Sequence, residues 1–259
     1  MIVDLHNHTP LCNHASGKME QYIDKAISNG TKFFGFSDHA PMEFDEKYRM
    51  SFSDMKKYET DVLNMKQKYA DKIEILLGYE VDYLEGYMDK RVLEADVDYL
   101  IGSVHFLNKW GFDNPEFIGK YDEVDIDELW CEYFETITNM VKSGYFDIVG
   151  HLDLIKVFNF KPNKNIEDIV RPTLRAIKEA DMTLEVNMAG LRKPVKELYP
   201  SYNILKEAFK MDIPITLGSD AHEPQQVGMF LEDVLEIVKS VGYKECATFS
   251  KRVRTMVSL

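Results

Sequence analysis

The sequence contains few cysteines. Only three of its 259 residues are cysteine, Cys12, Cys131 and Cys246, and no two of them have CxxC spacing. An odd number of widely separated cysteines argues against both a disulfide framework and a zinc site built from thiolates. We therefore expect the thiols to be reduced, with Cys12 serving as a packing residue.

Long hydrophobic runs and excess basic charge are also missing. No apolar run approaches the roughly 20 residues that span a bilayer, and Met1 leads directly into a strand-like stretch without a signal peptide. We therefore expect a cytoplasmic protein without a membrane partner. Lys and Arg number 31 against 44 Asp and Glu, a formal net charge of −13. That balance repels polyanions, so nucleic acid is not an expected partner.

The sequence has no glycine-rich dinucleotide fingerprint, no linker of biased composition and no internal repeat. It does alternate short apolar runs typical of strands with longer amphipathic stretches typical of helices. The predicted strands are 2–6, 33–37, 73–81, 99–104, 146–150, 183–187 and 214–219. The predicted helices are 18–29, 53–70, 85–95, 125–143, 165–180, 203–212 and 226–241.

A strand followed by a helix, seven times over, predicts an α/β protein with a parallel sheet covered by helices. Without the dinucleotide fingerprint, a barrel is favoured over a doubly wound sheet. The expected fold is a distorted seven-stranded (βα)7 TIM-like barrel forming one domain over 1–259. The segment 106–122 is too long for a tight loop, and we expect it to form a flap over one end.

Histidine is scarce, but its positions are not scattered. Six of the seven histidines lie at the carboxyl end of a predicted strand or within three residues after it. Because the carboxyl ends of parallel strands converge on one face of a barrel, residues far apart in sequence are expected to meet there. The residues at these strand ends are His6, His8, His39, Glu80, His105, His151, Asp220 and His222.

This set predicts a metal centre. In an extended segment His6 and His8 point the same way, so their imidazoles can bind one ion. Leaving so many imidazoles buried without metal would be costly, since their nitrogens would lack partners or their charges would repel. Imidazole and carboxylate suit zinc, manganese or iron. At three or four ligands per open site, the set predicts two to three divalent transition-metal ions.

Six short motifs occur in an order and spacing that resemble the polymerase and histidinol phosphatase (PHP) superfamily. They are DLHNHT, SDH, GYEV, GSVH, GHLD and GSDAH. Further stretches resemble the histidinol-phosphate phosphatase branch: HTPLCNHA at 8–15, SDHAPM at 37–42, GHLDLIK at 150–156, LEVNMAGLRKP at 184–194 and SDAHEPQQVG at 219–228. The resemblance covers essentially the whole chain.

The resemblance implies a seven-stranded distorted barrel with a trinuclear metal site. It assigns His6, His8, Glu80 and Asp220 to a first ion; Glu80, His105 and His151 to a second; and His14, His39 and His222 to a third. The implied activity is hydrolysis of L-histidinol phosphate to L-histidinol and phosphate in histidine biosynthesis, by a metal-activated water. Clustered divalent ions suit hydrolysis of phosphate monoesters in general.

Substrate contacts are expected from six further residues. Arg192 is the candidate for a bidentate phosphate clamp, and Lys156 stands where relatives often carry an arginine. Glu43, Glu185 and Phe106 are candidates for lining a pocket that recognises the imidazole and amine, together with Trp110. Asp220 or His222 could also handle a proton during the reaction.

Several alternatives stay open at this stage. Another phosphoesterase of the same superfamily, acting on a nucleotide or sugar phosphate, would use the same metal ligands. A barrel amidohydrolase also carries HxH on its first strand, although such enzymes usually bridge two metals with a modified lysine, and Glu80 stands in that place here. A metal-storage protein would bind ions without turnover. The sequence does not determine the native metal or the oligomeric state.

Overall fold

The computed structural model describes residues 2–259. Its central feature is a seven-stranded sheet with the order β1-β2-β3-β4-β7-β8-β9, and every neighbouring pair is parallel. The strands are β1 (Val3–Asp4), β2 (Phe33–His39), β3 (Glu74–Asp82), β4 (Tyr99–Ser103), β7 (Ile148–Val149), β8 (Thr183–Asn187) and β9 (Ile215–Gly218). Each of the seven strands predicted from the sequence is present.

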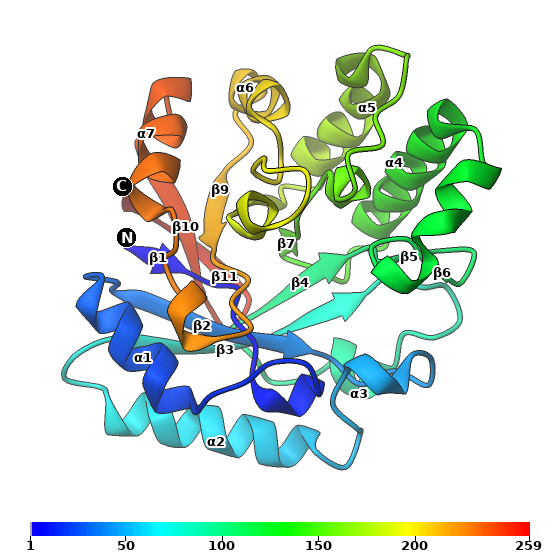
Figure 1. Cartoon of the computed structure of the whole chain (residues 1–259). Helices are drawn as coiled ribbons and strands as arrows, with labels where there is room; N and C mark the ends of the chain where they lie inside the picture. Colours follow the sequence, from blue (N-terminus) through cyan, green and yellow to red (C-terminus); the bar gives the residue numbers. More distant parts are fainter. Residues whose placement is uncertain (1) are drawn as a thin grey trace.

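The sheet curls so that its first and last strands meet (Figure 1). The amide of Leu5 donates to the carbonyl of Leu217 at 2.9 Å, and the amide of Asp220 donates to the carbonyl of His6 at 2.7 Å. The amide of His8 donates to the carbonyl of Ala221 at 2.9 Å. These bonds join the segment after β1 to β9 and to the residues that follow β9, so the chain forms a distorted seven-stranded barrel in a single α/β domain, as predicted.

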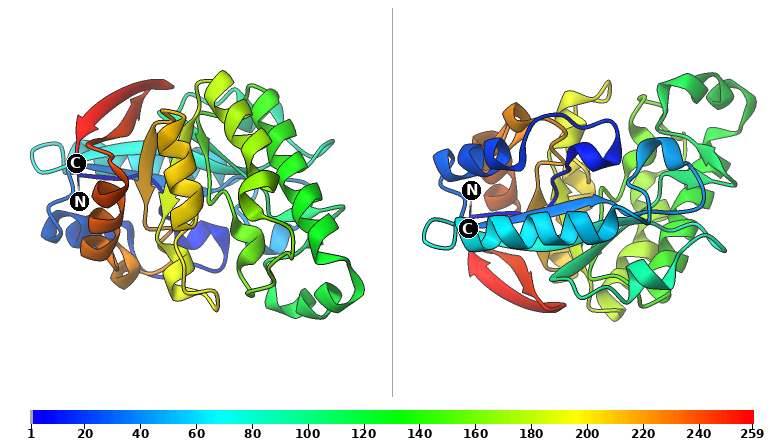
Figure 2. Two further views of the ribbon diagram at one scale, coloured as in Figure 1. Left: turned by 90° about the horizontal axis from the view of Figure 1, so that it is seen from above. Right: turned by 90° about the horizontal axis from the view of Figure 1, so that it is seen from below.

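Helices cover the outside of the barrel (Figure 2). They are α1 (Met19–Ser28), α2 (Met55–Lys68), α3 (Lys90–Leu93), α4 (Ile126–Lys142), α5 (Ile166–Glu179), α6 (Tyr202–Lys210) and α7 (Leu231–Val241). The side chains of Asp125 and Asn165 cap α4 and α5 by accepting hydrogen bonds from first-turn amides. The α3 helix is much shorter than the predicted 85–95, because a turn around Gly86, whose φ is +84°, interrupts that stretch.

The interior of the barrel is filled by large aromatic side chains placed against glycines. Tyr99 is completely buried, and its hydroxyl donates to the carbonyl of Leu5 at 2.5 Å. A Cβ at Gly78 would lie 2.5 Å from the ring of Tyr99, and one at Gly35 would overlap its hydroxyl. The two glycines therefore make room for one tyrosine that links three strands.

The chain ends in an antiparallel hairpin that the sequence analysis did not predict. It consists of β10 (Glu245–Ser250) and β11 (Val253–Ser258), and β10 packs against β9 and β1. Arg252 in the turn forms an ion pair with Asp147, just before β7, and the amide of Lys251 donates to the carboxylate of Asp98, just before β4. The hairpin thereby covers the amino-terminal ends of the strands, opposite the histidines.

The predicted flap over 106–122 is present as an ordered excursion after β4. It contains the short antiparallel pair β5 (Phe106–Leu107) and β6 (Trp110–Gly111), followed by the 3-10 helix η3 (Pro115–Glu123). Lys120 lies over the ring of Trp110 at 4.8 Å, and Trp110 packs edge-on against Tyr121. Trp110 therefore holds the flap together. No helix in residues 2–259 is long and apolar enough to cross a membrane.

Candidate metal centre and phosphate site

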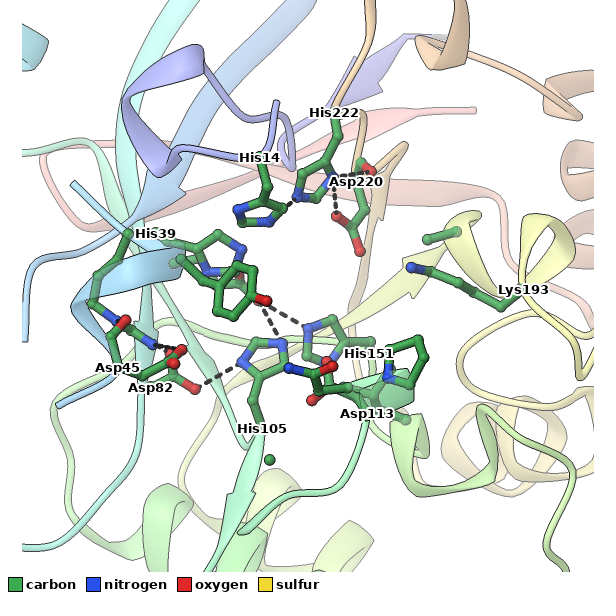
Figure 3. Close-up of a pocket in the computed structure, with 18 of the residues that line it drawn as sticks. His14, His39, Asp45, Asp82, His105, Asp113, His151, Lys193, Asp220 and His222 are labelled. Atoms are coloured by element: carbon green, nitrogen blue, oxygen red, sulfur yellow. Dashed lines mark hydrogen bonds and ion pairs between the residues drawn. The ribbon is translucent and has the colours of Figure 1, made fainter. Parts of the chain in front are cut away.

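The candidate metal ligands gather at the carboxyl ends of the strands. His39 ends β2, Glu80 lies near the end of β3, and the others belong to the segments that follow β1, β4, β7 and β9. They meet around a cavity of about 580 Å³, whose floor and sides are shown in Figure 3. His6 and His8 are fully buried beneath this floor. Barrel topology thus brings together residues that are more than 200 positions apart.

Glu80 lies at the centre of the group. Its Oε2 lies 3.0 Å from His39 Nδ1, 3.4 Å from His6 Nε2 and 3.7 Å from His8 Nε2. Its Oε1 lies 2.8 Å from His151 Nε2 and 3.7 Å from His105 Nε2. One carboxylate oxygen therefore faces each of two histidine groups, which is the arrangement that a bridging ligand requires.

Three groups of side chains present ligand atoms that lie within 4.8 Å of one another in each group. They are His6, His8 and Glu80; Glu80, His105 and His151; and His14, His39 and His222. Asp220 adjoins the first group, with its Oδ1 3.2 Å from His8 Nε2. A further combination of His8, Cys12 and His222 also meets the distance limit, but burial raises the pKa of the Cys12 thiol well above its ordinary value.

The ring nitrogens that face away from these groups are held by oxygen atoms. His6 Nδ1 lies 2.7 Å from Glu185, His105 Nδ1 lies 2.7 Å from Asp82 and His8 Nδ1 lies 3.3 Å from Asp38. His14 and His222 contact the carbonyls of Cys12 and Asp220 through Nδ1, at 2.8 and 3.2 Å. Such partners fix the ring orientation and leave each Nε2 directed at its group.

The electrostatics of the groups differ. Burial lowers the pKa of His14 and His222, and it lowers that of His39 to about 4, so these imidazoles are neutral and can donate a lone pair. Burial opposes protonation of His6 as well, but the carboxylates of Glu185 and Glu80 outweigh it and raise its pKa well above the usual value. The region around His6 therefore has an excess of negative charge that favours a bound cation.

Unpartnered buried atoms test whether these residues fit metal ions. Atoms of five ligands are buried and have no hydrogen-bond partner among residues 2–259: His6 Nε2, His8 Nε2, His39 Nδ1, Glu80 Oε2 and His151 Nδ1. Leaving such atoms unsatisfied costs about 1–3 kcal/mol each. Four of them belong to groups whose ligand atoms already converge, so divalent ions fit the donor set well. The structure thus contains His/Glu metal-binding clusters.

Arg192 provides a cationic side of the cavity. It belongs to the short 3-10 helix Ala189–Arg192 after β8, and its Nη2 donates to the carbonyls of Ser219 and Asp220, both at 2.9 Å. Its Nη1 is buried and has no partner within the described residues. Lys193 lines the same side and is labelled in Figure 3. The two carbonyls fix the guanidinium through Nη2, and the Nη1 donor is left available to bind a phosphate oxygen.

The structure corrects three of the expected substrate contacts. Lys156 is buried away from the cavity, with its Nζ 2.8 Å from Asp153, 3.2 Å from Glu197 and 2.7 Å from the carbonyl of Leu198. Lys156 follows β7, as the sequence predicts. The 3-10 turn Leu154–Lys156 nevertheless directs its side chain into the protein. Lys156 therefore lies in an interior ion pair and does not line the cavity.

The other two corrections concern carboxylates. Glu185 is buried behind the ligands, where it contacts His6 and accepts a hydrogen bond from the amide of His151 at 2.8 Å, so it does not line the cavity. Glu43 is exposed and lies outside the cavity, with its charge acting on Arg91. Phe106, by contrast, lines the cavity as expected and packs edge-on against Phe44 at 5.1 Å.

We predict that Lys156→Met lowers stability and leaves substrate affinity nearly unchanged. Removing one partner of a buried ion pair leaves Asp153 unpaired, which typically costs about 3 kcal/mol. Urea unfolding and the KM for a phosphate ester, measured on the same preparation, test this. A large rise in KM without loss of stability would instead show that Lys156 contacts the phosphate of the substrate.

Several residues of the site escaped the sequence analysis. Asp38 and Asp82 orient ligands, and each has a signal in the sequence: Asp38 directly precedes His39, and Asp82 lies two positions after Glu80 on the same face of β3. Arg49, paired with Asp82 at 3.0 Å, and the flap residue Asp113 line the cavity from segments without such a signal. Their positions depend on how the loops fold.

Comparison with known proteins places the chain in a family. Residues 4–189 match the family model described as PHP domain. The matched region contains seven of the nine candidate metal ligands, and the last two lie beyond it. The chain belongs to the PHP domain family.

Similar proteins carry related names. A protein of Deinococcus radiodurans named probable histidinol-phosphatase is 37% identical, covering 93% of this chain and 94% of its own. The histidinol-phosphatase of Bacillus subtilis is 31% identical, covering 90% and 98%. The crystal structure of histidinol phosphate phosphatase from Lactococcus lactis, in complex with zinc, L-histidinol and phosphate, has a TM-score of 0.81 at 22% identity, covering 98% of both chains. That last likeness shows the shared fold.

Proposed function

We propose that this protein hydrolyses L-histidinol phosphate to L-histidinol and inorganic phosphate. The observation that carries the proposal is the free Nη1 of Arg192 on the wall of a cavity whose floor holds three converging ligand groups. A phosphate monoester needs both a cationic clamp and clustered positive charge. The names of the relatives that are 37% and 31% identical support the choice of histidinol phosphate among such esters.

The ligand set supports two to three divalent ions, of which zinc, manganese and iron all suit imidazole and carboxylate. His6, His8, Glu80 and Asp220 would hold the first, Glu80, His105 and His151 the second, and His14, His39 and His222 the third. When bound, such ions supply positive charge that activates water and stabilises the phosphoryl oxygens.

The protein's own residues bind and orient the ester. Arg192 donates from Nη1 to a phosphoryl oxygen, and Lys193 adds charge at the same side. Water forms a bond to phosphorus and gives up a proton, the bond from phosphorus to the ester oxygen breaks, and the leaving alkoxide takes up that proton. Asp220 or His222, which line the cavity 3.5 Å apart, would accept the proton from water and pass it to the alkoxide.

A phosphate-release assay tests the substrate. The protein is loaded with zinc, manganese or iron and supplied with histidinol phosphate, nucleoside monophosphates and sugar phosphates in parallel. We expect a kcat/KM for histidinol phosphate at least about a hundredfold above the others, because unpaired polar groups in the cavity penalise substrates that cannot match them. Comparable rates on all three classes would show that histidinol phosphate is not the preferred substrate, while phosphate ester hydrolysis would stand as the reaction.

The cytoplasmic location stays a prediction.

A further inference from the structure

The charged residues that line the cavity are almost all accounted for. Arg49 pairs with Asp82 at 3.0 Å and with Asp45 at 3.5 Å, while Glu80 and Asp220 belong to the metal-ligand groups. Two carboxylates of the lining remain without a hydrogen bond or ion pair among residues 2–259, namely Asp113 and Glu223. Glu223 is exposed, whereas Asp113 is only partly exposed.

Asp113 reaches the cavity from the flap. It lies between β6 and η3, and in Figure 3 its side chain is beside His105 and His151. Its charge reaches across the cavity: burial raises the pKa of Asp45 against the pull of Arg49, and Asp113 adds to that rise. A carboxylate in this position that makes no hydrogen bond or ion pair within residues 2–259 is available to a cationic ligand, because Arg49 is already paired with Asp82 and Asp45.

The flap also supplies apolar surface around this carboxylate. Phe106 and Phe117 line the same cavity, and Phe117 is 49% exposed, so its ring is free to pack against a ligand. A ligand with an ammonium group beside a flat ring would satisfy both the carboxylate and the aromatic rings. Arg192 and Lys193 also line the cavity, and the proposed function assigns them to the phosphate.

We propose that Asp113 determines the preference of the enzyme for one class of phosphate ester. Its carboxylate would pair with an ammonium group on the carbon next to the one that carries the phosphate ester. This proposal rests on the proposed function and assigns its specificity to one side chain. The substrate class is thus an amino-alcohol phosphate. Its ammonium group would pair with Asp113 on the flap, and its phosphate group would bind Arg192. Neutral phosphate esters would leave Asp113 unpaired.

The test uses Asp113→Asn, which keeps the shape and removes the charge. Its matched control is Glu116→Gln, because Glu116 is on the same flap but is exposed and pairs only with Lys47 at 3.7 Å. We expect Asp113→Asn to weaken L-histidinol binding to the metal-loaded protein about 10- to 100-fold by calorimetry, and to lower kcat/KM for histidinol phosphate equally. Inhibition by inorganic phosphate and turnover of p-nitrophenyl phosphate should change less than about twofold, as should every value for Glu116→Gln.

The outcomes separate the two proposals. If the wild type hydrolyses histidinol phosphate and Asp113→Asn loses no L-histidinol affinity, the specificity assignment is wrong and the proposed function stands. An equal loss on p-nitrophenyl phosphate would also overturn it, since that ester carries no cation. If the wild type neither binds L-histidinol nor hydrolyses its phosphate, both proposals fail. Thermal unfolding of each variant shows whether the flap is intact.

Discussion

Glu80→Gln should abolish most of the activity and reduce the metal content of the purified protein. The substitution removes the charge that faces two histidine groups and replaces one of the two donor oxygens, so the neighbouring ions lose a shared ligand. Metal ions supply several kcal/mol of transition-state stabilisation, and 1.36 kcal/mol corresponds to a factor of ten in rate. We expect a fall in kcat of about a thousandfold or more, with at least one ion fewer per chain by elemental analysis.

Glu185→Gln is the matched control for this experiment. Glu185 is also buried and also contacts His6, at 2.7 Å, but it lies behind the ring instead of in the ligand group. Losing a partner of this kind costs about 10- to 100-fold in affinity or activity. A Glu80→Gln protein with full metal content and a rate within tenfold of the wild type would show that Glu80 does not bridge the two groups.

Arg192→Ala should lower kcat/KM for the phosphate ester by about a hundredfold or more, because removing one positioned donor to a developing anion has an effect of that size. Arg192→Lys should recover only part of the loss, since an ammonium cannot bind two carbonyls through one nitrogen and a phosphate oxygen through another. The inhibition constant of inorganic phosphate should rise in parallel.

Metal content provides the control for Arg192. The guanidinium touches the backbone of Ser219 and Asp220 but no ligand atom, so elemental analysis should find as many ions in the variant as in the wild type. A variant that keeps the wild-type rate would show that Arg192 does not bind the phosphate ester. A variant that loses metal together with activity would show instead that Arg192 stabilises the loop that contains Asp220.

The convergence of most candidate metal ligands could be predicted because it follows from topology, whereas His14 and the division into three groups came from the family resemblance. Once the sequence indicates parallel strands, residues directly after them must converge, and that argument needs no knowledge of loop shape. His6, His39 and Glu80 are fixed in this way. Pairwise contacts such as Glu80 with His151 follow from the same convergence, although the distances do not.

The substrate contacts were harder to predict because they depend on where a side chain turns after its strand has ended. Lys156 and Glu185 both lie close to the correct strands, yet the first turns into an ion pair and the second lies behind a histidine. Asp113 and Arg49 come from loops whose paths no periodic pattern describes. The C-terminal hairpin was missed for a related reason, because the exposed β11 lacks a regular alternation of buried and exposed positions.

The hydrogen bonds from Leu5 to Leu217 and from Asp220 to His6 have a consequence for synthesis of the protein. The first ligand group combines residues from the earliest and the latest parts of the chain, and contacts of such long sequence separation form slowly. A nascent polypeptide still attached to the ribosome at residue 200 therefore contains six of the seven histidines but lacks Asp220 and His222. The group of Glu80, His105 and His151 needs no later residue, whereas the groups that include Asp220 and His222 can be completed only when translation is nearly finished.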